Sequence, residues 1–312
     1  MTGFQRLCLL TCAVIFGLIV LGGVVRHTDS GLGCPDWPRC HGSFIPKWEK
    51  HTLIEYSHRF VASGSGLLVI GIVIAAWRNF RRVPAVLYPA AATFVLILVQ
   101  GGLGGAAVVN ELPPEIVAVH LSMALTILAL LLLLTATAFA LSSTPPRVPI
   151  SSSFGRIALA AAATTLLLMI VGSYVSGAGY GLACSGWPLC NGEVVPSADA
   201  ASVQVHFLHR FLALVLGVAL VALAWRAWLE RDSAPYLVPF AGVALVVYVA
   251  QALVGAANIW TELSEEAGAA HLALGTLLWT LLVMLNIRVH RLYELLPHSQ
   301  RVAQADLLGA PR

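Results

Sequence analysis

Long apolar runs limit what this chain can fold into more than any other feature. Eight runs are long enough to cross a bilayer as helices, which takes about 20 residues each. They cover residues 7–25, 53–77, 84–108, 115–141, 157–175, 203–225, 235–257 and 265–287. In hydrocarbon, a segment must satisfy its own backbone N–H and C=O groups, so runs of this length favour helices over open sheet. We predict an all-α membrane protein with eight transmembrane helices.

The composition agrees with a chain surrounded by membrane lipid. Only 11% of the 312 residues are charged, whereas a soluble protein carries about 25%. The mean hydropathy is +0.84. Basic residues stand between the apolar runs and form no patch, so we expect no nucleic-acid partner. The first run is longer than the apolar region of a signal peptide and lacks a clear cleavage site, so we expect it to be a helix of the fold.

Arginine and lysine are distributed unevenly between the two sides of the predicted membrane region. If the N-terminus lies inside, the inner segments hold twelve arginines and the outer loops hold four basic residues. Inner segments of membrane proteins carry the excess of positive charge. This bias predicts a multi-pass protein of the cell inner or plasma membrane with both termini in the cytoplasm, or on the matrix side in an organelle.

The chain repeats itself with an offset of 150 or 151 residues. The matched pairs include Cys34 and Cys184, Trp37 and Trp187, Cys40 and Cys190, His58 and His209, Gln100 and Gln251, and His120 and His271. Each repeat holds four spans, an even number, so both halves have the same topology in the membrane. We predict two four-helix bundles, residues 1–141 and 156–289, with a cytoplasmic linker at 142–155 and a tail at 290–312. Three prolines keep the linker from being helical throughout.

Four histidines fall at matched positions inside predicted spans. These are His58, His120, His209 and His271, each about five or six residues from the outer end. At about 1.5 Å per residue, the four lie roughly 8 Å below that end. Two imidazoles at equal height on alternate helices can grip a flat metal macrocycle, and imidazole is an ordinary axial ligand of haem iron. The alternative is four hydrogen-bonded core histidines. Zinc fits less well, because structural zinc takes four ligands and each bundle offers two or three.

Four charged or polar side chains accompany these histidines, two of them at matched positions before His58 and His209 and two directly after. Glu55 lies three residues before His58 on the same helix face, and the matching residue of the second half is His206. A glutamate inside a span predicts a proton carrier or an electrostatic stabiliser. The alternative is an interfacial ion pair. His206 is either another ligand or a replacement where no chemistry occurs.

Arg59 and Arg210 directly follow His58 and His209. An arginine near the outer surface is suited to bind the propionate groups of a haem. Snorkelling of the side chain to the membrane interface is the alternative.

Each long outer loop contains two cysteines with five residues between them, Cys34 with Cys40 and Cys184 with Cys190. On the oxidising side of a membrane each pair is expected to form a disulfide that closes the loop. A redox role is open for the first pair, whereas a structural staple is the simpler reading of the second. Cys8 and Cys12, inside the first span, are expected to be buried thiols.

The combined pattern resembles the haem A synthase family. The resemblance covers nearly the whole chain and depends on the eight spans in two halves, Glu-x-x-His-Arg at 55–59, His209-Arg210, the histidines at 120 and 271, and the paired loop cysteines. It implies oxidation of the C8 methyl group of haem O to a formyl group by successive hydroxylations, which gives haem A for cytochrome oxidase.

The resemblance also implies site residues and partners. The cofactor haem b would be held by His209 and His271, and the substrate haem O would lie near His58 and His120 in the first half. Glu55 matches the family's important acid, and Cys34 with Cys40 its outer-loop disulfide. Partners would be membrane lipid, a haem O synthase and an unidentified electron donor. The oligomeric state stays open, with a homo-oligomer as one option.

Two other functions use the same histidines. A di-haem b protein that oxidises a quinol would keep two permanent haems and would not need Glu55. A haem transporter or chaperone would need an opening on the inner side, but all four histidines lie toward the outer side.

Overall fold

Eight long helices make up most of the part of the chain that the structure, a computed structural model, describes: residues 1–143 and 148–294. They are α1 (Gly3–His27), α2 (Lys50–Phe80), α3 (Pro84–Val109), α4 (Pro114–Ala140), α5 (Ser152–Gly177), α6 (Ala201–Leu229), α7 (Leu237–Trp260) and α8 (Glu265–Val289). Each is long and apolar enough to cross a membrane. A short 3-10 turn, η1 (Leu292–Glu294), follows α8, and the described residues form no strand. The predicted all-α fold with eight spans is confirmed.

Local sequence signals explain where several helices begin. Thr2 caps α1, since its hydroxyl accepts from the N–H of Gln5 at 3.2 Å and the Gln5 side chain accepts from the N–H of Thr2 at 2.8 Å. Prolines occupy the first positions of α3 and α4, where the missing N–H has no cost. The Ser151 hydroxyl accepts from the N–H of Phe154 and starts α5.

Two predicted boundaries were wrong. Because of the Ser151 cap, residues 152–155 of the predicted linker are helical. Helix α7 begins two residues after the predicted start of its span. Residues 144–147 of the linker and 295–312 of the predicted tail lie outside the described residues. The exact residue limits of the two halves stay a prediction.

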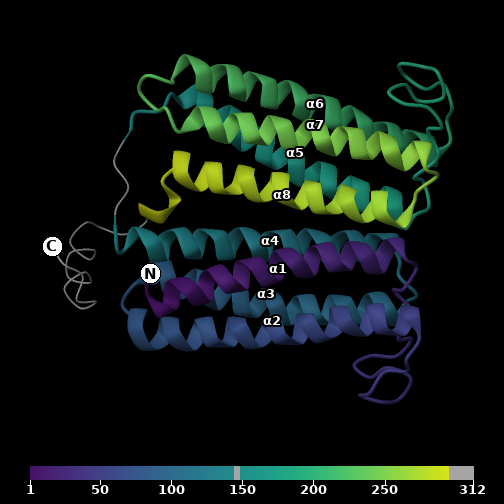
Figure 1. The fold of residues 1–312 in the computed structure, drawn as a ribbon, viewed down its shortest axis with the longest axis horizontal. Coiled ribbons are helices and arrows are strands. Elements are labelled where there is room, and N and C mark those ends of the chain that lie inside the picture. The colour runs from purple at the N-terminus through teal and green to yellow at the C-terminus, as the bar shows by residue number, and fades with distance from the viewer. Residues whose placement is uncertain (144–147, 295–312) are drawn as a thin grey trace.

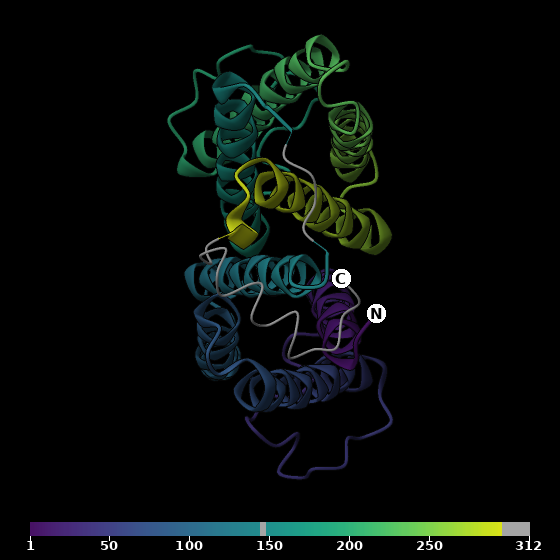
Figure 2. The ribbon, with the colours of Figure 1, turned by 90° about the vertical axis from the view of Figure 1, so that its left-hand side faces the viewer.

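The helices form two bundles with the same cycle of neighbours. In the first half α1 contacts α2, α2 contacts α3, α3 contacts α4, and α4 contacts α1. Helices α5 to α8 repeat this cycle. Figure 2, seen along the helices, shows two rings of four, one above the other. The arrangement agrees with the parallel duplication in the sequence.

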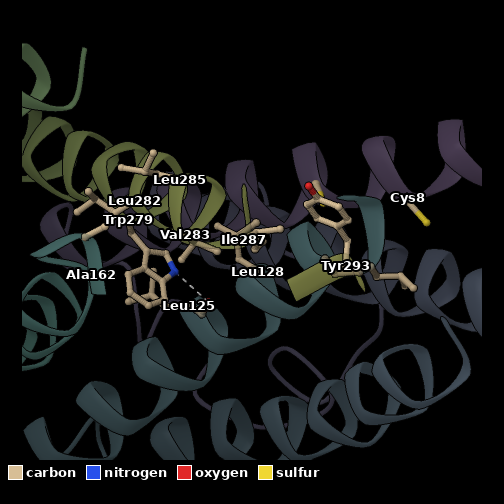
Figure 3. Close-up of a cluster of buried hydrophobic side chains, with 14 of the residues drawn as sticks. Cys8, Leu125, Leu128, Ala162, Trp279, Leu282, Val283, Leu285, Ile287 and Tyr293 are labelled. Atoms are coloured by element: carbon tan, nitrogen blue, oxygen red, sulfur yellow. Dashed lines mark hydrogen bonds between the residues drawn. The ribbon is translucent and has the colours of Figure 1, made fainter. Parts of the chain in front are cut away.

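The two bundles share a packed interface made by α1 and α4 on one side and α5 and α8 on the other. Trp279 of α8 is buried there, and its indole N–H donates to the backbone carbonyl of Leu125 in α4 at 3.1 Å (Figure 3). A Cβ atom added at Gly23 of α1 would lie 2.9 Å from the side chain of Leu272 in α8. Close packing at small residues is what holds membrane helices together, since lipid is as apolar as leucine. The two halves are therefore in direct contact.

Both long loops, 28–49 and 178–200, project from the same end of the molecule (Figure 1). The N-terminus lies at the opposite end. An even number of spans in each half predicts that both long loops lie at the same end of the molecule, as they do.

Candidate functional site

The four histidines occupy repeat-matched positions on alternate helices. His58 and His209 lie eight residues after the first residues of α2 and α6, and His120 and His271 lie six residues after those of α4 and α8. The predicted depth of five or six residues from the start of the span therefore holds for His120 and His271 but not for His58 and His209. The difference of two residues is about 3 Å of helix and arises because α2 and α6 begin earlier, in the long loops.

In the second half, the two imidazoles face each other at a distance suited to one shared metal. The ring centroids of His209 and His271 are 6.3 Å apart, with 59° between the ring planes. Bonds from an imidazole nitrogen to a metal are about 2.0–2.1 Å, so two rings on opposite faces of one ion have centroids roughly 6 Å apart. The spacing of this pair fits axial ligation of an iron macrocycle.

The hydrogen bonding of these two rings is also suited to ligation. Within the described part of the chain, Nδ1 of His209 and Nδ1 of His271 are buried and make no hydrogen bond of standard geometry. Each ring lies near a backbone carbonyl, that of Leu168 or of Gln251. A carbonyl beside the second nitrogen is the usual device that fixes the tautomer of a ligating histidine.

The first half arranges its two histidines differently. His58 and His120 are close enough to interact electrostatically. The side-chain nitrogen of Gln100 in α3 lies 3.1 Å from Nε2 of His120, and it also donates to the His120 carbonyl at 3.1 Å. Nε2 of His120 therefore has a protein partner in the first half.

Each imidazole packs over a glycine of the preceding helix. A Cβ atom added at these glycines would lie close to the ring, at 3.4 Å for Gly22 and His58, 3.2 Å for Gly104 and His120, 2.7 Å for Gly172 and His209, and 3.0 Å for Gly255 and His271. The glycines repeat with offsets of 150 (Gly22 and Gly172) and 151 residues (Gly104 and Gly255). The sequence analysis missed this pairing, although repeat alignment of the glycines could have shown it.

Glu55 and Arg59 are bound to each other beneath the first outer loop. Glu55 is buried, and its Oε1 accepts from Nε of Arg59 at 2.8 Å. The two Nη atoms of Arg59 donate to the carbonyls of Cys34, Asp36 and Arg39, at 2.7, 2.7 and 2.9 Å. Four of the five N–H donors of the guanidinium are used in this way. Arg59 thus holds the disulfide loop on top of the helix that carries His58.

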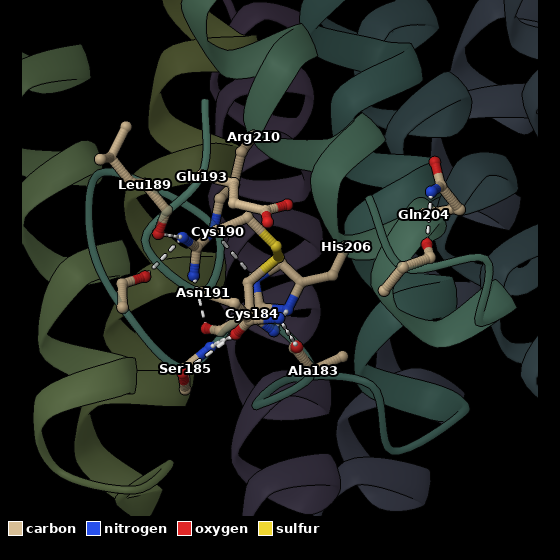
Figure 4. Close-up of a disulfide and its surroundings, with 12 residues drawn as sticks. Ala183, Cys184, Ser185, Leu189, Cys190, Asn191, Glu193, Gln204, His206 and Arg210 are labelled. Atoms are coloured by element: carbon tan, nitrogen blue, oxygen red, sulfur yellow. Dashed lines mark hydrogen bonds between the residues drawn. A yellow bond between two sulfur atoms is a disulfide. The ribbon is translucent and has the colours of Figure 1, made fainter. Parts of the chain in front are cut away.

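Arg210 repeats this arrangement in the second half (Figure 4). Its Nη atoms donate to the carbonyls of Cys184, Gly186 and Leu189, at 2.8, 2.5 and 2.8 Å. Its Nε donates to Nε2 of His206 at 3.3 Å. Nδ1 of His206 lies 2.9 Å from the carbonyl oxygen of Tyr180 and 3.3 Å from the backbone nitrogen of Cys184, both in the second outer loop. His206 is therefore a structural replacement for Glu55 within the same loop contact.

Both expected disulfides are formed, between Cys34 and Cys40 and between Cys184 and Cys190, and both are buried. Cys8 and Cys12 are free, buried thiols, as predicted.

The first disulfide loop carries an acid that the second lacks. The carboxylate of Asp36 accepts from the backbone N–H groups of His41 and Gly42, at 2.5 and 2.8 Å. These hydrogen bonds hold the pKa of Asp36 below its ordinary value. In the second loop, the neutral side chain of Asn191 accepts instead, from the N–H and hydroxyl of Ser185.

His27 lies between the two halves. It ends α1 and is half-buried against Gly268 of α8, where an added Cβ would lie 2.2 Å from its Nδ1. It is close enough to act electrostatically on His271. The contact crosses the bundle interface, and no local sequence signal marks it.

Comparison with known proteins identifies the family. The COX15-CtaA family, described as cytochrome oxidase assembly proteins, matches residues 5–52 and 47–283. This chain belongs to that family. A COX15-CtaA relative named haem A synthase from Shouchella clausii is 34% identical over 296 residues, covering 93% of this chain and 98% of the relative. Relatives of the same name from Symbiobacterium thermophilum and Geobacillus kaustophilus are each 32% identical, covering 75% and 89% of this chain and 79% and 90% of their own lengths. The resemblance stated from the sequence is confirmed at the level of the family.

Proposed function

We propose that this chain is a haem A synthase, a membrane oxidoreductase that converts the C8 methyl group of haem O to a formyl group by successive hydroxylations. The observation that carries the proposal is the duplicated pair of histidines with an acid, Glu55, in one half only. Two similar haem sites of which only one carries an acid suit a substrate beside a resident cofactor. The names and coverage of the COX15-CtaA relatives support the same activity.

The second half is the proposed site of resident haem b. His209 and His271 would be the axial ligands, and their ring spacing of 6.3 Å fits that role. When bound, haem b supplies the electron chemistry. The protein's part is to orient the two imidazoles, which the backing glycines Gly172 and Gly255 support.

The first half is the proposed site of the substrate haem O, beside His58 and His120. Arg59 uses Oε1 of Glu55, which leaves Oε2 as the oxygen to hold or release a proton near the substrate. Arg59 and Arg210 each keep one Nη2 N–H that is suited to a haem propionate. A site between membrane-spanning helices also suits the long apolar tail of haem O.

The proposed orientation has both termini in the cytoplasm and the haem sites toward the outer side. Twelve arginines on the inner side support it. Disulfides at the opposite end agree, because disulfides persist in oxidising compartments. A haem O synthase would deliver the substrate, and a separate donor would supply electrons.

Co-expression tests the function. The chain is produced together with a haem O synthase in a host that lacks haem A, and extracted haems are identified by chromatography and mass. We expect haem b together with haem A. Two equivalents of haem b and no haem A would instead indicate a di-haem electron-transfer protein and would overturn the proposal.

A further inference from the structure

The substrate half contains a side chain that competes for a candidate iron ligand. The amide nitrogen of Gln100 lies 3.1 Å from Nε2 of His120 and 3.1 Å from the His120 carbonyl. An amide nitrogen is only a donor, so Nε2 of His120 is the acceptor. An imidazole nitrogen has one lone pair in the ring plane. The lone pair that Gln100 occupies is the one that iron would need.

The orientation of the Gln100 amide follows from the same contacts. If the amide were rotated by 180°, its oxygen would face the oxygen of the His120 carbonyl, and neither could donate. In the observed orientation, Oε1 of Gln100 is buried without a hydrogen bond in the described chain. The hydrogen bonds to His120 therefore hold the amide although its own oxygen is unsatisfied.

The resident half has the matching glutamine but not the contact. Gln251 lies 151 residues after Gln100, and in the described part of the chain its side chain makes no hydrogen bond to His271. Its amide nitrogen instead lies beside Gly275, where an added Cβ would be 3.3 Å away. The position that matches Gly275 in the first half is Ala124. Ala124 carries a methyl group at the position where Gly275 has none, and Gln100 makes the contact to the histidine that Gln251 lacks.

We propose that Gln100 is a positioning residue that makes iron ligation by His120 reversible. A substrate must enter and a product must leave, whereas a resident cofactor must stay. Gln100 gives His120 an alternative partner when iron leaves, while His209 and His271 have no such partner and keep their haem. This inference depends on the proposed function, because it assigns haem O to the first half.

Haem O dissociation tests the inference. Purified protein with its resident haem b is loaded with haem O, and transfer of haem O to excess apomyoglobin is followed by absorbance. Gln100→Leu removes the competing donor, so we expect roughly three- to tenfold slower haem O dissociation, the range that one hydrogen bond represents. The spectrum of bound haem O should also gain six-coordinate, low-spin character, which a merely structural role of Gln100 would not produce.

The matched control is Gln251→Leu, which should leave haem O dissociation at the wild-type rate. If the Gln100→Leu variant loses its resident haem b, Gln100→Asn replaces it in the experiment. The asparagine side chain is too short to reach Nε2 of His120. Unchanged dissociation and ligation in both Gln100 variants would overturn the inference alone, provided that the wild type still makes haem A. A wild type that neither binds haem O nor makes haem A would overturn the proposed function and this inference together.

Discussion

Oε1 of Glu55 lies 2.8 Å from Nε of Arg59, and the two side chains are only 7% and 15% exposed. The same place in the second half holds His206 beside the cationic Arg210, at 3.3 Å. Both pairs support the same contact between a helix and a disulfide loop. The loop contact as such therefore does not require an acid, which agrees with the proposed catalytic role of Glu55.

Glu55→Ala should keep resident haem b and make little haem A, because it removes the acid beside the substrate. The extracted haems measure how much haem A is made, and the absorption spectrum of the purified variant measures how much haem b it retains. His206→Ala is the matched control, and it should lower loop stability while haem A is still made. Normal haem A production by the Glu55 variant would refute the catalytic role.

Arg59→Lys and Arg210→Lys should loosen their disulfide loops. A lysine lacks the planar fork that reaches three carbonyls at once, so we expect a loss of about 2–4 kcal/mol in local stability. Each loss of about 1.4 kcal/mol raises the equilibrium constant for opening of the loop tenfold. The rate of disulfide reduction by dithiothreitol measures this opening. Arg78→Lys, at an exposed position beyond the other membrane face, is the control, and equal reduction rates in all three variants would exclude the clamp.

His209→Ala and His271→Ala should each lose the haem b spectrum of the purified protein, because each removes one axial ligand. His58→Ala should keep it, since that residue belongs to the half proposed to bind the substrate. An unchanged spectrum in either of the first two variants would remove that residue from the proposed ligands.

Gly172→Ala should weaken haem b retention. The new methyl group would lie 2.7 Å from Cε1 of His209, so the ring or the helix must shift, and such overpacking costs about 1–3 kcal/mol. Haem b content after purification measures the effect. In Gly22→Ala the corresponding distance to His58 is 3.4 Å, an ordinary contact, so this matched variant should be tolerated. Full haem b content in both would show that the ring is not held by close packing.

The first loop should loosen at acidic pH while the second does not. Hydrogen bonds from Gly42 and His41 lower the pKa of Asp36 in the folded loop. The Asp36 carboxylate stabilises the folded loop fully when the pH is above 3.8, its ordinary pKa. This stabilisation is lost as the pH falls through the lower pKa that Asp36 has in the folded loop. Proteolysis of each loop by pepsin between pH 2 and about pH 4 measures the difference. Asp36→Asn should abolish the pH dependence of the first loop, and equal pH dependence in both loops would contradict this assignment.

The sequence by itself determined the spans, the duplication and the helix that carries each candidate ligand. Apolar runs in lipid allow little besides helices, and the repeat offset assigns matching residues to matching helices. For this reason His58, His120, His209 and His271 could be found without coordinates, as could both disulfides.

Only the tertiary structure decided what these residues touch. Arg59 was expected to bind propionates, but four of its N–H groups hold a loop and a buried glutamate. Gln100 and Gln251 are the same residue at matched positions, but only Gln100 hydrogen-bonds the histidine of its half. Such outcomes depend on distances of a few tenths of an ångström between helices, and hydrophobic patterns along one chain carry no information at that scale.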